Sequence, residues 1–111
     1  MKNFLKKGFL IILGGMAIMI WAGAAVAGQG QNLYQEKCAL CHGDDGKGNG
    51  PGAAAFNPGP ANFTAPQFWQ GDVRDKIMNT VKNGKGTMEP VEASTSEIKA
   101  IIGYMEKTFK P

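Results

Sequence analysis

The chain has few side chains that bind soft metals: two cysteines and a single histidine in 111 residues. All three lie in one stretch, Cys38-Ala39-Leu40-Cys41-His42. A structural zinc site needs four ligands, so this set would require a carboxylate or a second chain to complete it. A disulfide between the two cysteines would close too short a loop to stabilise the fold much. The shortage therefore argues against a fold stabilised by disulfides or zinc, and it concentrates the metal-binding capacity at one point.

Strand patterns are also missing. No run of alternating apolar and polar residues, which would indicate a half-buried strand, occurs in the chain. Residues 31–40 instead have helical character and carry Cys38 at their C-terminal end. Residues 73–82 form a second helical segment, with Asp72 as N-cap and Asn83-Gly84 as the stop signal. We therefore predict an all-α domain.

A third helix is predicted near the C-terminus. Ser94 and Glu97 have the spacing of a capping box, in which each side chain accepts a hydrogen bond from the backbone of the other residue. The apolar residues that follow recur at helical spacing and form one stripe: Ile98, Ile101, Ile102, Met105 and Phe109.

A long segment without helical or strand period separates the first two helices. It reads GDDGKGNGPGAAAFNPGPANFTAPQFWQG over residues 43–71. A loop of this length is unusual in a compact domain unless it wraps around something. It is not a flexible linker, because its aromatic side chains need burial: Phe56, Phe63, Phe68 and Trp69.

The first 27 residues have a composition of their own. Lys2, Lys6 and Lys7 precede an apolar run over residues 8–25. Ala25-Val26-Ala27 then supplies the small residues that signal peptidase needs. We predict a secretory signal peptide over residues 1–27 and a domain over residues 28–111. The alternative is an uncleaved membrane anchor, because the apolar run is close to the ~20 residues that span a bilayer.

The formal net charge of +3 belongs to this N-terminal segment. Residues 28–111 hold nine Lys and Arg and nine Asp and Glu, so the predicted domain has no net charge. The basic isoelectric point therefore gives no support to nucleic-acid binding. Long-range electrostatic steering of partners should be weak for the same reason.

The Cys38–His42 cluster has two further readings besides zinc. A dithiol redox site of the thioredoxin type sits beside a βαβ pattern, which this chain lacks. Covalent haem attachment has C-x-x-C-H as its signature: the two thiols add to vinyl groups, and the adjacent histidine binds the iron. A domain of this size also needs an additional stabilising group, such as a disulfide or a metal, to complete its core, and a bound haem would be such a group. We therefore predict one haem c, attached through Cys38 and Cys41, with His42 as an axial ligand.

The sixth iron ligand is expected to be a methionine. A Met/His pair occupies both axial positions of the iron and raises its reduction potential, as suits electron transfer. Met78 and Met105 lie on apolar helix faces and are assigned to the core. Met88 stands in a glycine-containing loop and belongs to no apolar helix face. The neighbouring glycines let the backbone approach a flat ligand closely. We predict that Met88 takes the sixth position.

Taken together, these residues resemble a class I (mitochondrial-type) monohaem cytochrome c of the small bacterial periplasmic kind. The resemblance covers residues 30–109. Gly30 and Tyr34 match small and aromatic positions of the family's N-terminal helix, and Ile101 and Tyr104 match positions of its C-terminal helix. The resemblance implies the cytochrome c fold, with three main helices and long Gly/Pro-rich loops wrapped around one covalently bound haem. It also implies that the N- and C-terminal helices cross nearly perpendicularly, with the glycine permitting close contact.

The resemblance further implies a hydrogen bond that fixes the histidine ring. In the family, a loop proline carbonyl accepts this bond from the ring nitrogen that does not bind iron. Pro60 is the expected residue and Pro51 the fallback, while Trp69 and Asn62 are candidates for binding the haem propionates. One departure is that Glu89 follows Met88, where the family often has proline.

The function we expect is periplasmic electron transfer without catalysis. The partners would be transient redox proteins, with no nucleic acid and with the protein a monomer. One alternative is a haem-based gas or redox sensor, or a weak peroxidase, in which Met88 dissociates. Another is an anchored cytochrome subunit of a membrane oxidoreductase, with Gly8–Ala27 retained in the inner membrane and the domain facing the periplasm.

Overall fold

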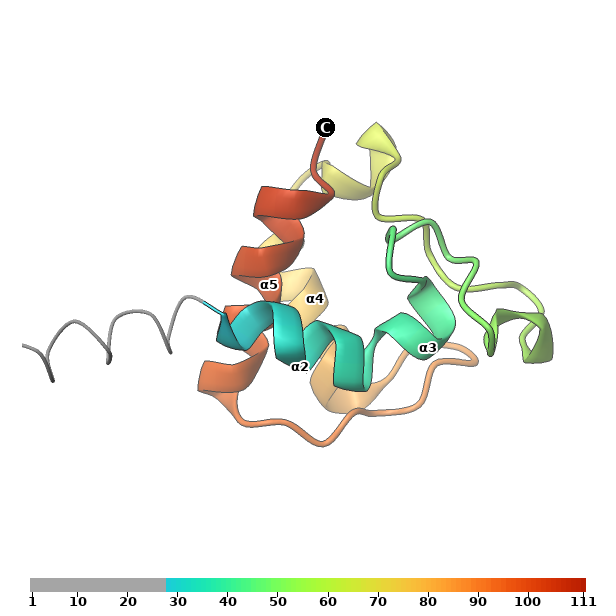
Figure 1. Cartoon of the computed structure of the whole chain (residues 1–111), viewed down its shortest axis with the longest axis horizontal. Helices are drawn as coiled ribbons and strands as arrows, with labels where there is room; N and C mark the ends of the chain where they lie inside the picture. Colours follow the sequence, from blue (N-terminus) through green and yellow to red (C-terminus); the bar gives the residue numbers. More distant parts are fainter. Residues whose placement is uncertain (1–27) are drawn as a thin grey trace, which may run out of the picture.

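The structure is a computed structural model in which residues 28–111 are described (Figure 1). The predicted signal peptide over residues 1–27 lies outside the described residues. Within residues 28–111, four α-helices are joined by loops that contain two short 3₁₀ helices. In chain order these six elements are α2 (Gln29–Lys37), α3 (Ala39–His42), η1 (Ala53–Ala55), η2 (Pro66–Trp69), α4 (Val73–Asn83) and α5 (Thr95–Thr108).

The all-α prediction is confirmed. Within residues 28–111, extended pairing is limited to an isolated bridge between Lys85 and Met88. No helix in this range is both long and apolar enough to cross a membrane.

The predicted first helix is broken at Cys38. Its N–H still donates to the carbonyl of Tyr34 at 2.8 Å, but its backbone (φ −122°, ψ −36°) departs from α-helical geometry. A new turn starts there, because the carbonyl of Cys38 accepts from the N–H of His42 at 3.0 Å. The chain therefore forms two short helices, α2 and α3, where we predicted one.

The other two helices lie close to their predicted bounds. α4 follows Asp72, although the Asp72 side chain makes no capping hydrogen bond. α4 ends where Gly84 adopts a φ of 76°. α5 begins with the predicted capping box: Glu97 N–H donates to Ser94 Oγ at 3.1 Å, and Ser94 N–H donates to Glu97 Oε1 at 2.9 Å.

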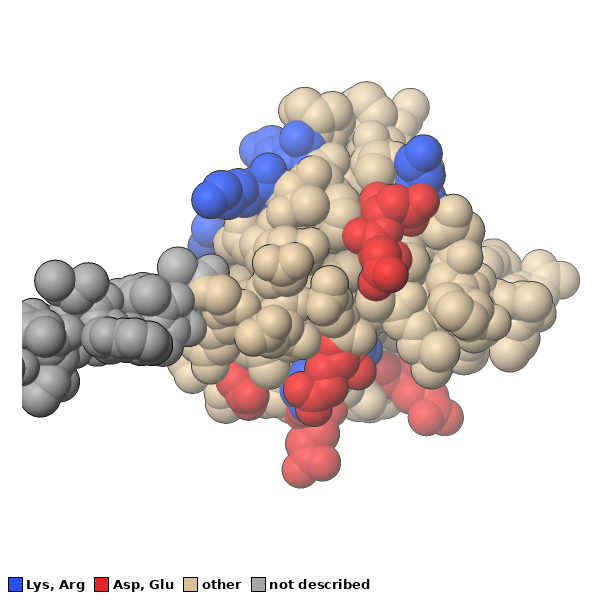
Figure 2. Space-filling model, in the orientation of Figure 1, with Lys and Arg blue, Asp and Glu red and all other residues tan. Residues whose placement is uncertain are grey.

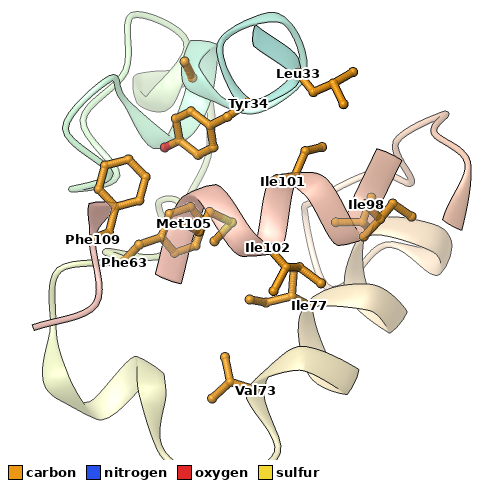
Figure 3. Packing of buried hydrophobic residues seen from close by; sticks show 12 residues of the cluster. Leu33, Tyr34, Phe63, Val73, Ile77, Ile98, Ile101, Ile102, Met105 and Phe109 are labelled. Atoms are coloured by element: carbon orange, nitrogen blue, oxygen red, sulfur yellow. The ribbon is translucent and has the colours of Figure 1, made fainter. Parts of the chain in front are cut away.

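The core is built around α5, which lies between α2 and α4 (Figure 3). Its predicted apolar stripe is buried from Ile98 to Phe109. Leu33 and Tyr34 of α2 pack on one side of this stripe, and Val73 and Ile77 of α4 lie on the other.

Gly30 sets how closely α2 and α5 approach. A side chain at this position would overlap the carbonyl oxygen of Ala100, and it would lie 3.0 Å from Tyr104 Cβ. The predicted close contact at a glycine is therefore present, and Tyr34 and Tyr104 pack beside it with ring centroids 5.4 Å apart.

Candidate functional site

The break between α2 and α3 positions both cysteines of the predicted haem motif. Cys38 occupies the junction and Cys41 the third position of α3, and both are half-buried free thiols. Burial raises the pKa of the Cys38 thiol to about 11, the charge of Lys37 opposes this shift in part, and the neighbouring Cys41 adds to it. Cys38 therefore carries its proton at neutral pH.

The imidazole of His42 is held between an aromatic ring and a backbone carbonyl. It stacks on Phe63 with ring centroids 4.4 Å apart and planes 19° from parallel. His42 Nδ1 lies 3.1 Å from the carbonyl oxygen of Ala61. Because a carbonyl can only accept, Nδ1 carries the proton and Nε2 keeps its lone pair for a metal.

The charge state of His42 suits this role. Burial lowers the pKa of the imidazole below its ordinary value, and the hydrogen bond to Ala61 opposes this shift in part. The ring is therefore neutral at neutral pH, which is the form that binds iron.

The carbonyl that faces His42 differs from the predicted one by one residue. We expected Pro60, or Pro51 as the fallback, and the structure places Ala61 there. The carbonyl of Pro60 lies instead against Gly48, which has no side chain and a φ of 79°. The N–H of Phe63 donates to the carbonyl of Gly46 at 2.6 Å, and this bond fixes the register of the loop against α3.

Alternating glycines satisfy the free carbonyls of α3. The N–H groups of Gly48, Gly50 and Gly52 donate to the carbonyls of His42, Cys41 and Leu40, at 2.7, 3.0 and 2.8 Å. A side chain at Gly50 would lie 2.5 Å from the carbonyl oxygen of Ala39, so this approach requires glycine. Sequence reasoning missed this role, although the G-x-G-x-G pattern at residues 48–52 is a visible signal.

A buried tyrosine links α2 to the end of α3. The Tyr34 hydroxyl donates to the carbonyl of Gly43 at 2.7 Å, and the side chain is fully buried. Burial is the main cause that raises the pKa of Tyr34, so the hydroxyl stays protonated and keeps donating. This bond holds the residue that follows His42.

Met88 lies on a separate loop after α4, half-buried. Lys85 and Met88 exchange two backbone hydrogen bonds, at 2.9 and 3.0 Å, around Gly86 with a φ of 58°. The loop is fixed to the rest of the domain after this turn: Val91 N–H donates to the carbonyl of Val81 at 2.8 Å, and Lys37 Nζ donates to the carbonyl of Glu92 at 2.9 Å. Met88 therefore lies at the end of a closed turn, and the residues that follow it are hydrogen-bonded to α4 and α2.

The other methionines and the predicted propionate partners have roles within the chain. Met105 is buried in the core, and Met78 is half-buried and packs against it. Trp69 Nε1 donates to the carbonyl of Phe63 at 2.6 Å. The side-chain oxygen of Asn62 accepts from the N–H of Thr64 at 2.9 Å.

The residues present fit a covalently attached haem. Two half-buried thiols lie three residues apart, one at the junction of α2 and α3 and one in α3, and a neutral imidazole with a free Nε2 follows directly. Glycines keep the adjacent loop free of side chains where it meets α3.

Comparison with known proteins agrees with this chemistry. Residues 25–105 match the family model described as cytochrome C oxidase, cbb3-type, subunit III. The chain belongs to this family. As a member of the cbb3 subunit III family it is an electron-transfer cytochrome of the c type, so the predictions of a cytochrome c fold and of haem c as the cofactor are confirmed.

Three curated relatives are each named as a subunit of a cbb3-type cytochrome c oxidase. The chain is 32% identical over 82 residues to the cbb3-type cytochrome c oxidase subunit FixP of Azorhizobium caulinodans, which covers 71% of this chain and 26% of the relative. It is 30% identical over 80 residues to subunit CcoP of Rubrivivax gelatinosus, a match that covers 68% of this chain and 24% of the relative. It is 29% identical over 82 residues to subunit FixP of Bradyrhizobium diazoefficiens, a match that covers 71% of this chain and 26% of the relative. The chain thus spans about a quarter of the length of these relatives.

Proposed function

We propose that this chain is a class I, monohaem cytochrome c that passes electrons one at a time within, or directly to, a cbb3-type terminal oxidase. The observation that carries the proposal is the family match over residues 25–105, which includes the whole Cys38–His42 cluster and the Met88 loop. The relatives named above are oxidase subunits, and this favours an oxidase partner over a freely diffusing one.

Each site residue has one role in this proposal. Cys38 and Cys41 hold the haem through thioethers, and His42 and Met88 bind the iron. When bound, the haem supplies an iron that cycles between the ferric and ferrous states. The carbonyl of Ala61 and the ring of Phe63 fix the orientation of the imidazole.

The chain acts as a carrier in this proposal and has no catalytic site of its own. Its single histidine is assigned to the iron, and general acid–base chemistry would need a second titratable group beside it. Oxygen reduction would belong to the oxidase that accepts the electrons.

The apolar segment Gly8–Ala27 anchors the domain at the periplasmic face of the inner membrane in this proposal. The relatives favour an anchored subunit over the soluble carrier that we expected first. The soluble form keeps one specific observation in its favour, the Ala25-Val26-Ala27 pattern of a cleavage site.

Fractionation of a host that exports and matures c-type cytochromes separates the two forms. The anchored form gives a haem-containing protein in the membrane fraction, whose intact mass includes residues 1–27 and which co-purifies with the oxidase. A periplasmic protein that begins at Gly28 would refute the anchor. A variant with Ala25→Leu and Ala27→Leu is the matched control, because it blocks cleavage and moves a soluble protein to the membrane.

Oxygen uptake tests the electron-transfer role. Membranes of a strain that lacks the chain should consume oxygen more slowly through the oxidase, and the wild-type chain should restore the rate. Cys41→Ala, which removes one attachment point, should not restore it. Full restoration by this variant would contradict the proposed site.

A further inference from the structure

The charged side chains that α5 exposes are both lysines. Lys99, Gly103 and Lys107 recur at intervals of four residues, so they lie along one side of the helix, and all three are exposed. No atom of another element of residues 28–111 lies within 4 Å of the position that a Cβ of Gly103 would take, so this side of the helix is uncovered at its middle. We call these three residues the basic face of α5.

The two carboxylates of α5 are engaged away from this face. Glu97 belongs to the capping box at the start of the helix, and Glu106 Oε1 lies 2.6 Å from Arg74 Nη2. This is the one salt bridge within residues 28–111, so the lysines of the basic face have no ion-pair partner there. Figure 2 shows blue atoms gathered at the upper left of the domain, over the C-terminal half of α5, with no red atoms beside them.

The basic face lies near the point where the apolar segment joins the domain. The start of α2 packs on the middle of α5, because Gly30 lets the backbone come against the carbonyl of Ala100, the residue next to Lys99. The apolar run over residues 8–25 ends three residues before α2 begins at Gln29. Three residues reach about 10 Å when fully extended, which is close to the Debye length of about 8 Å at physiological ionic strength. A membrane that holds the apolar run is therefore within electrostatic range of this end of the domain.

We propose that the basic face of α5 binds the phosphate groups of anionic lipids, and that it thereby holds the domain in one orientation against the membrane. This inference rests on the membrane anchor proposed above. The position beside the tether favours a lipid surface over an acidic protein, because an anchored domain faces the membrane at all times and meets a second protein only on encounter.

The size of the effect follows from the charge. Each lysine near an anionic bilayer surface strengthens the association about fivefold, and the attraction falls off within a Debye length. Two lysines therefore favour the bound orientation about 25-fold over orientations that turn the basic face away from the bilayer. The tether already limits the distance of the domain from the surface, so this preference is enough to order it.

Acetylation of lysines by a water-soluble reagent measures the contact directly. The full-length holoprotein, as the host matures it, is reconstituted into vesicles of phosphatidylcholine alone or mixed with phosphatidylglycerol, and mass spectrometry gives the rate at each lysine. Acetylation of Lys99 and Lys107 should be at least about fivefold slower in the anionic vesicles, and the difference should disappear at an ionic strength of about 1 M. Lys47, exposed on the loop that follows α3, is the internal control and should change less than about twofold.

A charge-matched pair of double variants tests the orientation. Lys99→Gln with Lys107→Gln removes the charge of the basic face, and Lys47→Gln with Lys85→Gln removes the same charge elsewhere. All four lysines are exposed, and glutamine and lysine have similar helix propensities, so both variants should fold. The covalently held haem serves as a fixed chromophore, whose linear dichroism in oriented anionic bilayers reports the ordering of the domain. This signal should fall at least about fivefold in the first variant and stay within about twofold of wild type in the second.

The intact mass of the same samples separates this proposal from the anchor. If residues 1–27 are retained and Lys99 and Lys107 react equally fast in both kinds of vesicle, the basic face is wrong and the anchor stands. Equal protection of Lys47 would also overturn the basic face, because the surface would then attract every lysine alike. Protection that requires the oxidase in the same vesicles, rather than anionic lipid, would assign the face to a protein contact. If the mature protein begins at Gly28, the anchor fails and the orientation proposal fails with it.

Discussion

Replacing Gly30 with alanine tests the closest contact in the fold. The added methyl group would overlap the carbonyl oxygen of Ala100 and lie 3.0 Å from both the Ala100 carbonyl carbon and Tyr104 Cβ. A backbone carbonyl cannot rotate away, so α2 and α5 must separate along the contact that Tyr34 and Tyr104 share. Overpacking of this kind costs about 1–3 kcal/mol, and here the obstacle is rigid, which places the cost at the upper end.

A smaller term opposes this cost. Alanine is favoured over glycine inside a helix by up to ~1 kcal/mol, and Gly30 lies near the start of α2, where the gain is reduced. We therefore expect Gly30→Ala to lower the free energy of unfolding by about 2 kcal/mol. For a domain of this size, that corresponds to a fall in Tm of about 8–16 °C.

Gly103 offers a matched control on the partner helix. It lies inside α5, is exposed, and has no atom within 4 Å of the position that a Cβ would take. Gly103→Ala should therefore stabilise the holoprotein by about 0.5–1 kcal/mol. Both variants are compared by denaturant unfolding of the oxidised holoprotein, followed by circular dichroism. Stabilisation by both substitutions would refute the close approach of α2 and α5.

Four further outcomes follow from the site and its supports. Met88→Ala should leave the sixth iron position open, so that the reduced holoprotein binds carbon monoxide and its absorption spectrum shifts. The spectrum of the reduced wild-type protein should not change when carbon monoxide is added. Rapid binding of carbon monoxide by the wild type would instead favour the sensor or peroxidase alternative. Tyr34→Phe should lower the free energy of unfolding by about 1–3 kcal/mol, because the carbonyl of Gly43 loses a buried donor, and an unchanged denaturation midpoint would count against that bond. Ser94→Ala should cost about 1 kcal/mol through loss of the cap. The hydrogen bonds from Ser94 lower the pKa of Glu97, so the stability that this carboxylate contributes is complete above the ordinary value of 4.5 and is lost as the pH falls through the lowered pKa. In Glu97→Gln this part of the acid dependence should disappear from thermal melts, and its persistence would argue against the capping box.

The parts of the fold that sequence reasoning recovered are those set by local patterns. The start of α5 follows from Ser94 and Glu97, which lie three residues apart and bond to each other. Its buried face follows from helical spacing of apolar residues. The haem motif was equally readable, because its chemistry is carried by five consecutive residues.

The details that were missed depend on contacts between distant segments. Ala61 rather than Pro60 faces His42 because the bond from Phe63 to Gly46 sets the loop register, and periodicity contains no information about such a bond. The break at Cys38 likewise accompanies the bonds from the glycines of residues 48–52 to the carbonyls of α3. The ligand role of Met88 stays a prediction, since the structure supplies the loop and its anchors.

The position of α2 relative to the loop that follows α3 bears on how the domain can be attached. In Figure 1, the start of α2 lies at one end of the domain and the loop that follows α3 lies at the opposite end. A segment joined before α2 would therefore leave the domain away from that loop. The tether and the haem-attachment end of α3 are thus geometrically independent, and the same domain can present that end to a partner whether it is fixed to a membrane or released from it.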